Sequence, residues 1–419
     1  MNDPHGLTWH EGEYHLFFQY VPGSTEWAVG CHWGHATSVD LVSWRERGIA
    51  LAPGHTDDGV WSGSLVVDDA GRARIFYTSV REPNVSIGRI RTATPSTADW
   101  STWRKGAVVA TAPDDGRVAV FRDPYVFRDG SGWRMLVGAG LADGRGAVLS
   151  VNSPDLVSWT HDGLLAQPPA VAGSLWTGTV WECPQLVEVD GAHVLLVSVW
   201  AHDVLHYVAY AVGAYLDGQF QPGAWRRLTF GPSHYAGSLF RDELGRPGLV
   251  CWLREIGTLT GEPWRGALSI PYLLSLDGDV LVAAPHPSVM AAVEVRRAPD
   301  SARAPATLPV GPTLLPWRPR VGEELRLHAA AGVAVRLRSD RESVLVDLGE
   351  PYGVAELPLG AGEVTVLIDG PVLELRTDRG LLAAPVPALC AVSVGPASGM
   401  VLASASPSSI SFAQTFDKK

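Results

Sequence analysis

The sequence has few cysteines, no long apolar run and no excess of basic residues. Its four cysteines lie far apart, at Cys31, Cys183, Cys251 and Cys390, with no CxxC pair and no histidine cluster at zinc spacing. This distribution argues against a zinc site and is typical of reduced, mostly buried thiols. Because no apolar run approaches the roughly 20 residues that a membrane span needs, we expect no membrane partner.

The charge balance narrows the range of partners. Thirty-three basic residues against 44 acidic ones give a formal net charge of −11 over 419 residues. Nucleic acids and anionic membrane surfaces are bound by basic patches, so neither is expected as the main partner. A small neutral carbohydrate is compatible with this balance. No signal peptide precedes the first motif, and we therefore expect a cytoplasmic protein.

Five copies of one pattern dominate the first part of the sequence. In each copy a glycine-containing turn precedes an apolar strand, and the glycines are Gly12, Gly71, Gly132, Gly191 and Gly245, with spacings of 59, 61, 59 and 54 residues. Short strands with almost no helical periodicity indicate an all-β fold. A regular period over five units favours a five-bladed β-propeller over a large β-sandwich with accidental spacing.

The chain divides into three parts on this basis. We assign residues 1–297 to the propeller and 298–319, which are rich in proline and alanine, to a linker. From 320 to 419 apolar and polar residues alternate over short runs such as ELRLHAA and SVLVDLG. Such alternation is typical of antiparallel strands with one buried face, so a C-terminal β-sandwich is predicted. Its expected role is structural, with sugar binding as the alternative.

Three acidic residues stand out because proline follows each of them directly or one residue later. They are Asp3 in NDPHG, Asp123 in FRDPY and Glu182 in WECPQ. Any one of them alone is explained as a turn element. They fall in blades one, three and four, however, and the innermost strands of a propeller converge on its central channel. Three carboxylates meeting there repel one another and raise at least one pKa, which keeps one carboxyl protonated near neutral pH.

Such a set of carboxyl groups fits glycoside hydrolysis. That reaction needs one ionised carboxylate to attack the anomeric carbon or activate water, and one protonated carboxyl to donate to the leaving oxygen. A third carboxylate can bind the sugar hydroxyls and stabilise the oxocarbenium-like transition state. The 16 tryptophans, against ten tyrosines and ten phenylalanines, suit a carbohydrate site because aromatic faces stack on the C–H faces of sugars.

The segments NDPHG, FRDPY and WECPQL resemble the three acidic signatures of glycoside hydrolase family 32, which includes invertases, levanases, exo-inulinases and fructosyltransferases. Other segments that resemble the family occur in the expected order along the whole chain, namely YHLFFQY, HWGHATSVDLVSW, FGPSHYA, GLVCWL and VLIDGPVLEL. The resemblance implies a five-bladed propeller followed by a β-sandwich. It also implies that Asp3 forms a covalent fructosyl intermediate, Glu182 acts as acid/base and Asp123 stabilises the transition state.

The resemblance extends to residues around the acids. The positions that match the fructose pocket of the family are Asn2, Gln19, Trp27, Trp61, Ser62, Arg122 and Trp252. Arg122 is expected to keep the acids in the right charge states, and Cys183 to tune the acid/base without acting as a nucleophile. No metal or organic cofactor is implied. Among the departures from the family pattern, His5 replaces the usual Asn and Ser233-His234 replaces the Asp-Phe of many bacterial members, which puts the substrate in question.

The function that follows is release of terminal β-D-fructofuranosyl residues from sucrose and short fructo-oligosaccharides. The alternatives are exo-acting hydrolysis of inulin or levan, cleavage of arabinan or xylan on the same type of propeller, and a non-catalytic sugar-binding propeller. Retention of configuration predicts that the Asp3 and Glu182 carboxyl groups lie about 5–5.5 Å apart. Because Asp3 stands so early in the sequence, we expect either that further residues precede it or that neighbouring strands clamp it.

Overall fold

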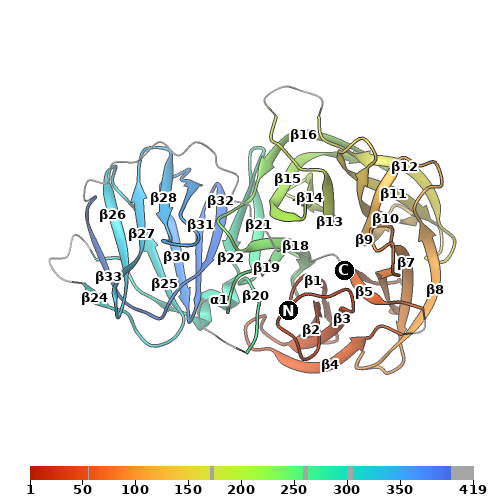
Figure 1. The fold of residues 1–419 in the computed structure, drawn as a ribbon, viewed down its shortest axis with the longest axis horizontal. Coiled ribbons are helices and arrows are strands. Elements are labelled where there is room, and N and C mark those ends of the chain that lie inside the picture. Colours follow the sequence, from red (N-terminus) through yellow and green to blue (C-terminus); the bar gives the residue numbers. More distant parts are fainter. Residues whose placement is uncertain (55, 170–173, 258–262, 300–304, 398–419) are drawn as a thin grey trace.

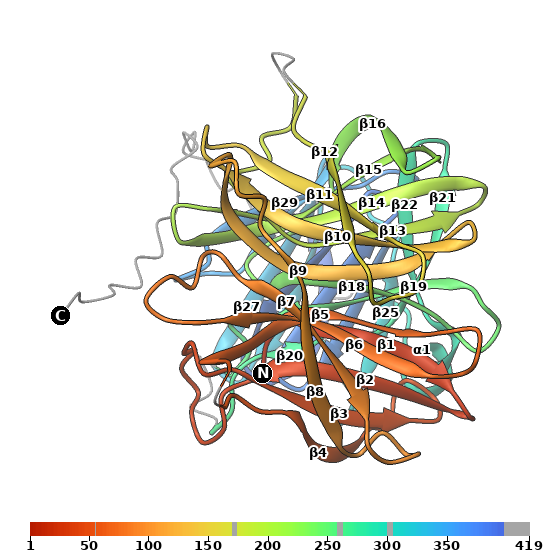
Figure 2. The same cartoon turned by 90° about the vertical axis from the view of Figure 1, so that its right-hand side faces the viewer.

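The structure, a computed structural model, describes residues 1–397 except 55, 170–173, 258–262 and 300–304. Two β-rich modules lie side by side, a ring of sheets and a flatter pair of sheets (Figure 1). Figure 2, seen from the side of the ring, shows the second module behind it. Within the described residues the one helix is the short α1 (Pro287–Ala292), and no helix there is long and apolar enough to cross a membrane.

Five antiparallel sheets, each with four main strands in sequence order, form the ring. The first two sheets contain β1 (Pro4–His10), β2 (Glu13–Tyr20), β3 (His32–Ser38), β4 (Arg45–Leu51), β5 (Gly59–Val67), β6 (Ala73–Val80), β7 (Arg89–Pro95) and β8 (Trp103–Thr111). The next two contain β9 (Val118–Asp129), β10 (Gly132–Leu141), β11 (Gly146–Ser153), β12 (Thr160–Ala166), β13 (Val180–Val189), β14 (Ala192–Ala201), β15 (Val204–Leu216) and β16 (Gln219–Arg227). The fifth contains β18 (His234–Arg241), β19 (Pro247–Leu253), β21 (Tyr272–Asp277) and β22 (Val280–Pro285), with the short β20 (Ala267–Leu268) paired to β19.

The innermost strands close the ring. They contact one another in a circuit that runs from β1 to β5, β9, β13 and β18 and returns to β1. The predicted five-bladed β-propeller is therefore confirmed. Four of the five repeated glycines, Gly12, Gly71, Gly191 and Gly245, lie in the first hairpin turn of their blades, where Gly12 has a φ of 90° and Gly191 a φ of 82°. In the third blade Gly132 is the first residue of β10, and Gly130 is the turn glycine with positive φ. Residues with a Cβ rarely adopt such angles, which explains why glycine marks the repeat.

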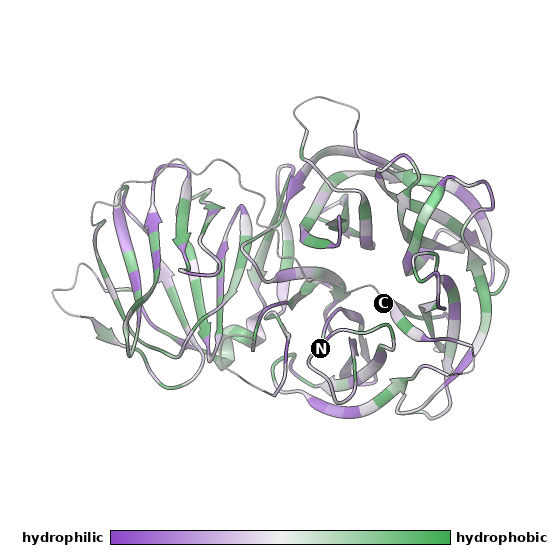
Figure 3. Ribbon diagram, in the orientation of Figure 1, coloured by the Kyte–Doolittle hydropathy of each residue, from purple (hydrophilic) through white to green (hydrophobic). Residues whose placement is uncertain are grey.

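The second strands of the blades are buried on both faces. In β10 and β14, for example, six or more consecutive residues are buried. Neighbouring blades cover each face of these strands, so the strands have continuous apolar runs in place of alternation. Figure 3 shows the resulting apolar bands around the ring.

Every innermost strand carries an irregularity in its pairing with the second strand. The register shifts between His5 and Thr8, between Trp61 and Gly63, between Arg122 and Tyr125, between Glu182 and Gln185, and between Tyr235 and Ser238. A bulge of this kind bends the strand and turns side chains away from the regular alternation. All three acidic motifs lie at or beside these bulges.

The second module is a sandwich of two six-stranded sheets around one apolar core, which confirms the predicted C-terminal β-sandwich. One sheet contains β17 (Thr229–Phe230), β32 (Gly380–Pro385), β31 (Val372–Thr377), β30 (Val364–Asp369), β25 (Thr313–Trp317) and β23 (Glu294–Val295). The other contains β24 (Ala306–Thr307), β33 (Leu389–Pro396), β26 (Glu323–Ala329), β27 (Gly332–Ser339), β28 (Ser343–Asp347) and β29 (Val354–Pro358). Because β17 comes from the propeller part of the sequence and pairs with β32, it ties the two modules together.

The structure places two strands inside 298–319, the range predicted as a linker. β24 pairs with β33 and β25 pairs with β30, so the described part of this range belongs to the sandwich. Leu315 and Trp317 are buried in the sandwich core. The proline and alanine content of the range resembles a linker, but these apolar side chains are needed to complete the core. Residues 398–419, also assigned to the sandwich, lie outside the described residues.

Two buried histidines link the stability of the first blade to pH. The Nδ1 of His15 lies 3.0 Å from the Nε2 of His35, and Trp100 of the second blade packs on His15 at 4.5 Å between ring centroids. Burial lowers the pKa of His15 to about 4 and that of His35 to about 3. The unfolded chain protonates both residues below about pH 6.5. Their contribution to stability is therefore complete above pH 6.5 and is lost as the pH falls toward the folded pKa values.

We expect the pair to lower the melting temperature by about 3–4 °C between pH 6.5 and pH 5. A double His15→Gln, His35→Gln variant should show a shallower fall over the same range. His328→Gln in the sandwich, where His328 bonds to Ser393, should leave the slope unchanged. Differential scanning calorimetry at each pH measures these slopes. A double variant with the slope of the unmutated chain would contradict the role assigned to the pair.

Candidate active site

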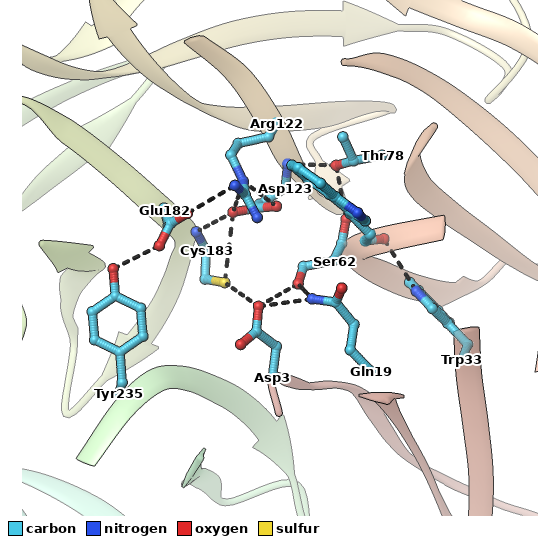
Figure 4. Close-up of polar contacts among 11 residues, drawn as sticks. Asp3, Gln19, Trp33, Ser62, Thr78, Arg122, Asp123, Glu182, Cys183 and Tyr235 are labelled. Carbon is cyan, nitrogen blue, oxygen red and sulfur yellow. Dashed lines mark hydrogen bonds and ion pairs between the residues drawn. The ribbon is translucent and has the colours of Figure 1, made fainter. Parts of the chain in front are cut away.

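The three acidic motifs meet in the propeller channel. Asp3 immediately precedes β1, Asp123 lies in β9 and Glu182 lies in β13. Their side chains point toward a common centre (Figure 4), and the residues are 8%, 2% and 7% exposed. Three blades thus bring together the three carboxyl groups that the sequence motifs indicate.

Asp3 is held by donors from two neighbouring strands. Ser62 Oγ donates to Asp3 Oδ2 at 2.6 Å, and Gln19 Nε2 donates to the same oxygen at 2.9 Å. The backbone N–H of Gln19 donates to the Asp3 carbonyl at 3.2 Å, and that of Asn2 donates to the Gln19 carbonyl at 2.8 Å. Neighbouring strands thus clamp this segment, which is one of the two arrangements expected for an acid so early in the sequence.

The electrostatic surroundings of Asp3 act in both directions. Burial raises its pKa, the hydrogen bond from Ser62 lowers it, Asp123 raises it and Arg122 lowers it, with a net upward shift. Among the described residues, the side-chain donors to Asp3 bind Oδ2. The other oxygen, Oδ1, is therefore free to contact a bound ligand.

Arg122 pairs with two of the three acids. Its Nη1 lies 3.0 Å from Glu182 Oε1, and its Nε donates to both oxygens of Asp123 at 3.1 Å. The guanidinium also lies over the Trp61 ring, 4.6 Å from the centroid. One buried cation thus offsets part of the repulsion among three buried carboxyl groups.

Glu182 is placed to hold a proton near neutral pH. Burial raises its pKa to about 7, against a lowering by Arg122 and a further rise from Asp123. The hydroxyl of Tyr235 donates to Glu182 Oε2 at 2.6 Å. Tyr235 lies in the FGPSHYA segment, but the sequence motif assigns it no role because its partner is 53 residues away in another blade.

Two residues at the bulges have an unusual backbone conformation and are held by hydrogen bonds. Asp123 and Cys183 have φ values of 61° and 48°, in the left-handed region that few non-glycine residues occupy. The Cys183 N–H donates to Asp123 Oδ2 at 3.1 Å, and the Asp123 N–H donates to Thr78 Oγ1 at 2.7 Å. Burial, with the nearby carboxylates, raises the pKa of Cys183 well above its usual range. The thiol therefore stays protonated and is a poor nucleophile.

The other predicted site residues form an inner and an outer group. The inner group contacts the acids or the arginine directly and consists of Gln19, Trp61 and Ser62. In the outer group, Trp27 is 46% exposed with its ring 5.6 Å from that of Trp61, and Trp252 has its ring 6.5 Å from that of Tyr235. Asn2 is half-buried next to the first acid. Trp27 is thus a partly exposed aromatic side chain next to Trp61, whose own ring contacts Arg122.

His5, a departure from the family pattern, fills space behind the site. It is 2% exposed, and its ring centroid lies 3.8 Å from that of Trp33. Burial lowers its pKa to about 3, so the ring is neutral at pH 7. Neither ring nitrogen has a hydrogen-bond partner among the described residues. His5 therefore packs beside Asp3 without binding its carboxyl group.

One group outside the site has metal-ligand types close together. In the part of the chain that the structure describes, Asp242, Glu243 and His286 each offer an atom within 4.8 Å of the others. The Oδ2 of Asp242 already accepts a hydrogen bond from Arg246 Nε at 2.6 Å and lies 3.4 Å from His286 Nε2. These contacts explain why the three residues lie together: the Asp242 carboxylate pairs with Arg246 and His286. None of the three central acids belongs to this group.

Known proteins resemble this chain in sequence. Residues 1–285 match the model of the Glycosyl hydrolases family 32 N-terminal domain. A raffinose invertase from Escherichia coli is 32% identical over 289 residues, which cover 65% of this chain and 59% of the relative. A sucrose-6-phosphate hydrolase from Bacillus subtilis is 31% identical over 309 residues, which cover 70% of this chain and 64% of the relative. The chain thus spans less than two thirds of the length of these curated relatives.

A solved structure shares the fold. The β-fructofuranosidase of Bombyx mori, solved as a mutant in complex with sucrose, has a TM-score of 0.77 and 23% sequence identity. The match covers 94% of this chain and 90% of that one. It therefore extends over both the propeller and the sandwich.

Proposed function

Because the chain belongs to glycosyl hydrolase family 32, we propose that it is a retaining β-fructofuranosidase that releases terminal fructosyl residues from sucrose and short fructo-oligosaccharides. One observation carries the proposal. Glu182, a buried carboxyl group with a pKa of about 7, shares one channel with a second buried carboxyl group, that of Asp3. Hydrolysis with retention needs such a pair, one group protonated and the other ionised.

In the first step Asp3 acts as the nucleophile. Its free oxygen attacks the anomeric carbon of the fructosyl unit while the bond from that carbon to the leaving oxygen breaks. Glu182 transfers its proton to the leaving oxygen, so the second sugar departs as a neutral alcohol. Asp123 accepts hydrogen bonds from the fructosyl hydroxyls and stabilises the positive charge that develops on the ring.

In the second step Glu182, now ionised, removes a proton from water. The water oxygen attacks the anomeric carbon and displaces Asp3, and Glu182 is again protonated. Arg122 and the hydroxyl of Tyr235 each bind one oxygen of Glu182. They stabilise the ionised form that must exist between the two steps.

Small fructosides are the substrates that the relatives support best. The two curated relatives are named a raffinose invertase and a sucrose-6-phosphate hydrolase, and the solved relative is bound to sucrose. The alternative is exo-acting hydrolysis of inulin or levan, which uses the same acids on the same terminal fructosyl unit. The two differ in what lies beyond the leaving oxygen.

Initial rates of fructose release test this proposal on sucrose, raffinose, 1-kestose, inulin and levan at equal concentrations of terminal fructosyl units. We expect sucrose and 1-kestose to react faster than either polymer. Faster release from inulin or levan would overturn the substrate assignment in favour of an exo-fructanase. Release from none of them, with sugar binding retained, would favour a non-catalytic propeller.

A further inference from the structure

A buried hydrogen-bond cluster joins the sandwich to the fifth blade. Glu374 of β31 is 3% exposed. Its Oε2 accepts hydrogen bonds from the Tyr272 hydroxyl at 2.6 Å and from His234 Nε2 at 3.3 Å, and its Oε1 accepts one from the Ile270 N–H at 2.9 Å. All three donors belong to the propeller. One buried carboxylate of the sandwich is therefore satisfied entirely from the other module.

One of these donors stands next to the tyrosine that touches Glu182. His234 and Tyr235 are the first two residues of β18, so their side chains point to opposite sides of the strand. His234 meets the sandwich, whereas Tyr235 donates to Glu182 Oε2 inside the channel. Both residues are buried, at 1% and 2% exposure. Two adjacent residues, His234 and Tyr235, thus connect the interface between the modules to the candidate acid/base.

The start of β18 has further contacts with the sandwich. The Ser233 N–H donates to the Ala383 carbonyl at 3.3 Å, and β17, only a few residues earlier, pairs with β32. Immediately after Tyr235 the strand bulges, and Ala236 has a φ of 45°. Tyr235 therefore lies between a bulge on one side and a segment held by the sandwich on the other.

We propose that Glu374 is a positioning residue for the acid/base: it holds His234 and, through the adjoining Tyr235, fixes the hydrogen bond to Glu182. This inference rests on the proposed role of Glu182. It gives the sandwich a part in the chemistry of the channel beyond structural support.

The carboxyl of Glu182 is faced by groups from several strands. They are Arg122 and Asp123 of β9, Asp3 before β1, Cys183 of its own strand, Tyr235 of β18 and Arg254 directly after β19, whose guanidinium also lies over the Tyr235 ring at 5.1 Å from the centroid. Tyr235 is the member of this set that adjoins the interface with the sandwich. Because its O–H donates to the carboxylate, a looser Tyr235 destabilises the ionised form and raises the pKa of Glu182.

The test compares Glu374→Gln with Tyr235→Phe and with a matched control, Glu324→Gln. Glu324 is also 3% exposed and lies in β26, in the sandwich sheet that does not contain β31. The pKa of Glu182 is read from infrared difference spectra across a pH series, in which its carboxyl band is assigned by loss in Glu182→Gln. This readout needs no turnover and is therefore independent of the substrate.

Tyr235→Phe should raise the pKa of Glu182 by about one unit, and Glu374→Gln by about half a unit. The double variant should show the shift of Tyr235→Phe alone, because Glu374 acts through Tyr235. His234→Phe, which keeps an aromatic ring but removes the donor, should reproduce the Glu374→Gln shift. A Glu374→Gln shift no larger than that of Glu324→Gln, or additive shifts in the double variant, would overturn the proposal.

Steady-state kinetics separate this inference from the proposed function. In an active chain, the basic limb of kcat against pH should move by the same amount in Glu374→Gln, with KM for sucrose changed less than about twofold. Shifts in the infrared titration of a chain that releases no fructose would support the positioning role and reject the proposed function. Fructose release by the unmutated chain, with no shift of the infrared titration in Glu374→Gln, would support the proposed function and reject the positioning role.

Discussion

Replacing Asp3 with asparagine is expected to lower kcat for sucrose by about 10⁴-fold or more. The amide keeps the shape of the carboxyl group and its oxygen can still accept hydrogen bonds from Ser62 and Gln19. It cannot form the covalent fructosyl ester on which the two-step mechanism depends. Because burial raises the pKa of Asp3, removal of its charge should not lower the melting temperature. Loss of activity without loss of stability distinguishes a nucleophile from a structural residue.

Initial rates and melting temperatures of Asp3→Asn are compared with those of Asp115→Asn. Asp115 pairs with Arg117 near the surface, and its replacement should leave kcat unchanged. The stereochemistry of the unmutated chain gives a second measurement, since two displacements release β-fructose before mutarotation. Residual activity of Asp3→Asn above about 1%, or α-fructose as the first product, would contradict the role of Asp3.

Glu182→Gln is expected to lower kcat for sucrose by about 10²–10⁴-fold. Glutamine can still pair with Arg122 and Tyr235, but it has no acidic proton to give to the leaving oxygen. Glu188→Gln is the matched control, because Glu188 lies on the same strand and is exposed. Its kcat should equal that of the unmutated chain. A Glu182→Gln variant with more than about a tenth of the original kcat would contradict the assignment of the acid/base.

The pH dependence of kcat/KM tests the assignment of Glu182 as acid/base independently. Burial raises the pKa of Glu182 to about 7, so kcat/KM should fall as the pH rises above 7 and the acid loses its proton. At low pH the rate should fall again as Asp3 gains a proton. Glu182→Gln should lose the basic limb and keep the acidic one. A basic limb that persists in this variant would assign it to another group.

The sequence alone determined the repeat and the three acids because both are local features. A turn position with a φ of about 80–90°, as at Gly12 and Gly191, strongly favours glycine, so these residues mark the blades in the sequence itself. Each acid stands beside a proline within five contiguous residues, and that arrangement is readable without a structure. Composition was a poorer guide at 298–319, where a few apolar side chains placed a proline-rich stretch in the sandwich core.

Only the tertiary structure decided how the acids are held and tuned. The hydrogen bond from Tyr235 to Glu182 spans 53 residues, and that from His234 to Glu374 spans 140. Contacts over such separations depend on how the ring closes and how the sandwich packs against it. The residues adjacent to Tyr235 and His234 in the sequence do not indicate these long-range contacts. Short sequence motifs therefore identify the candidate catalytic acids. Their protonation depends on burial and on partners that the fold brings from other blades and from the second module.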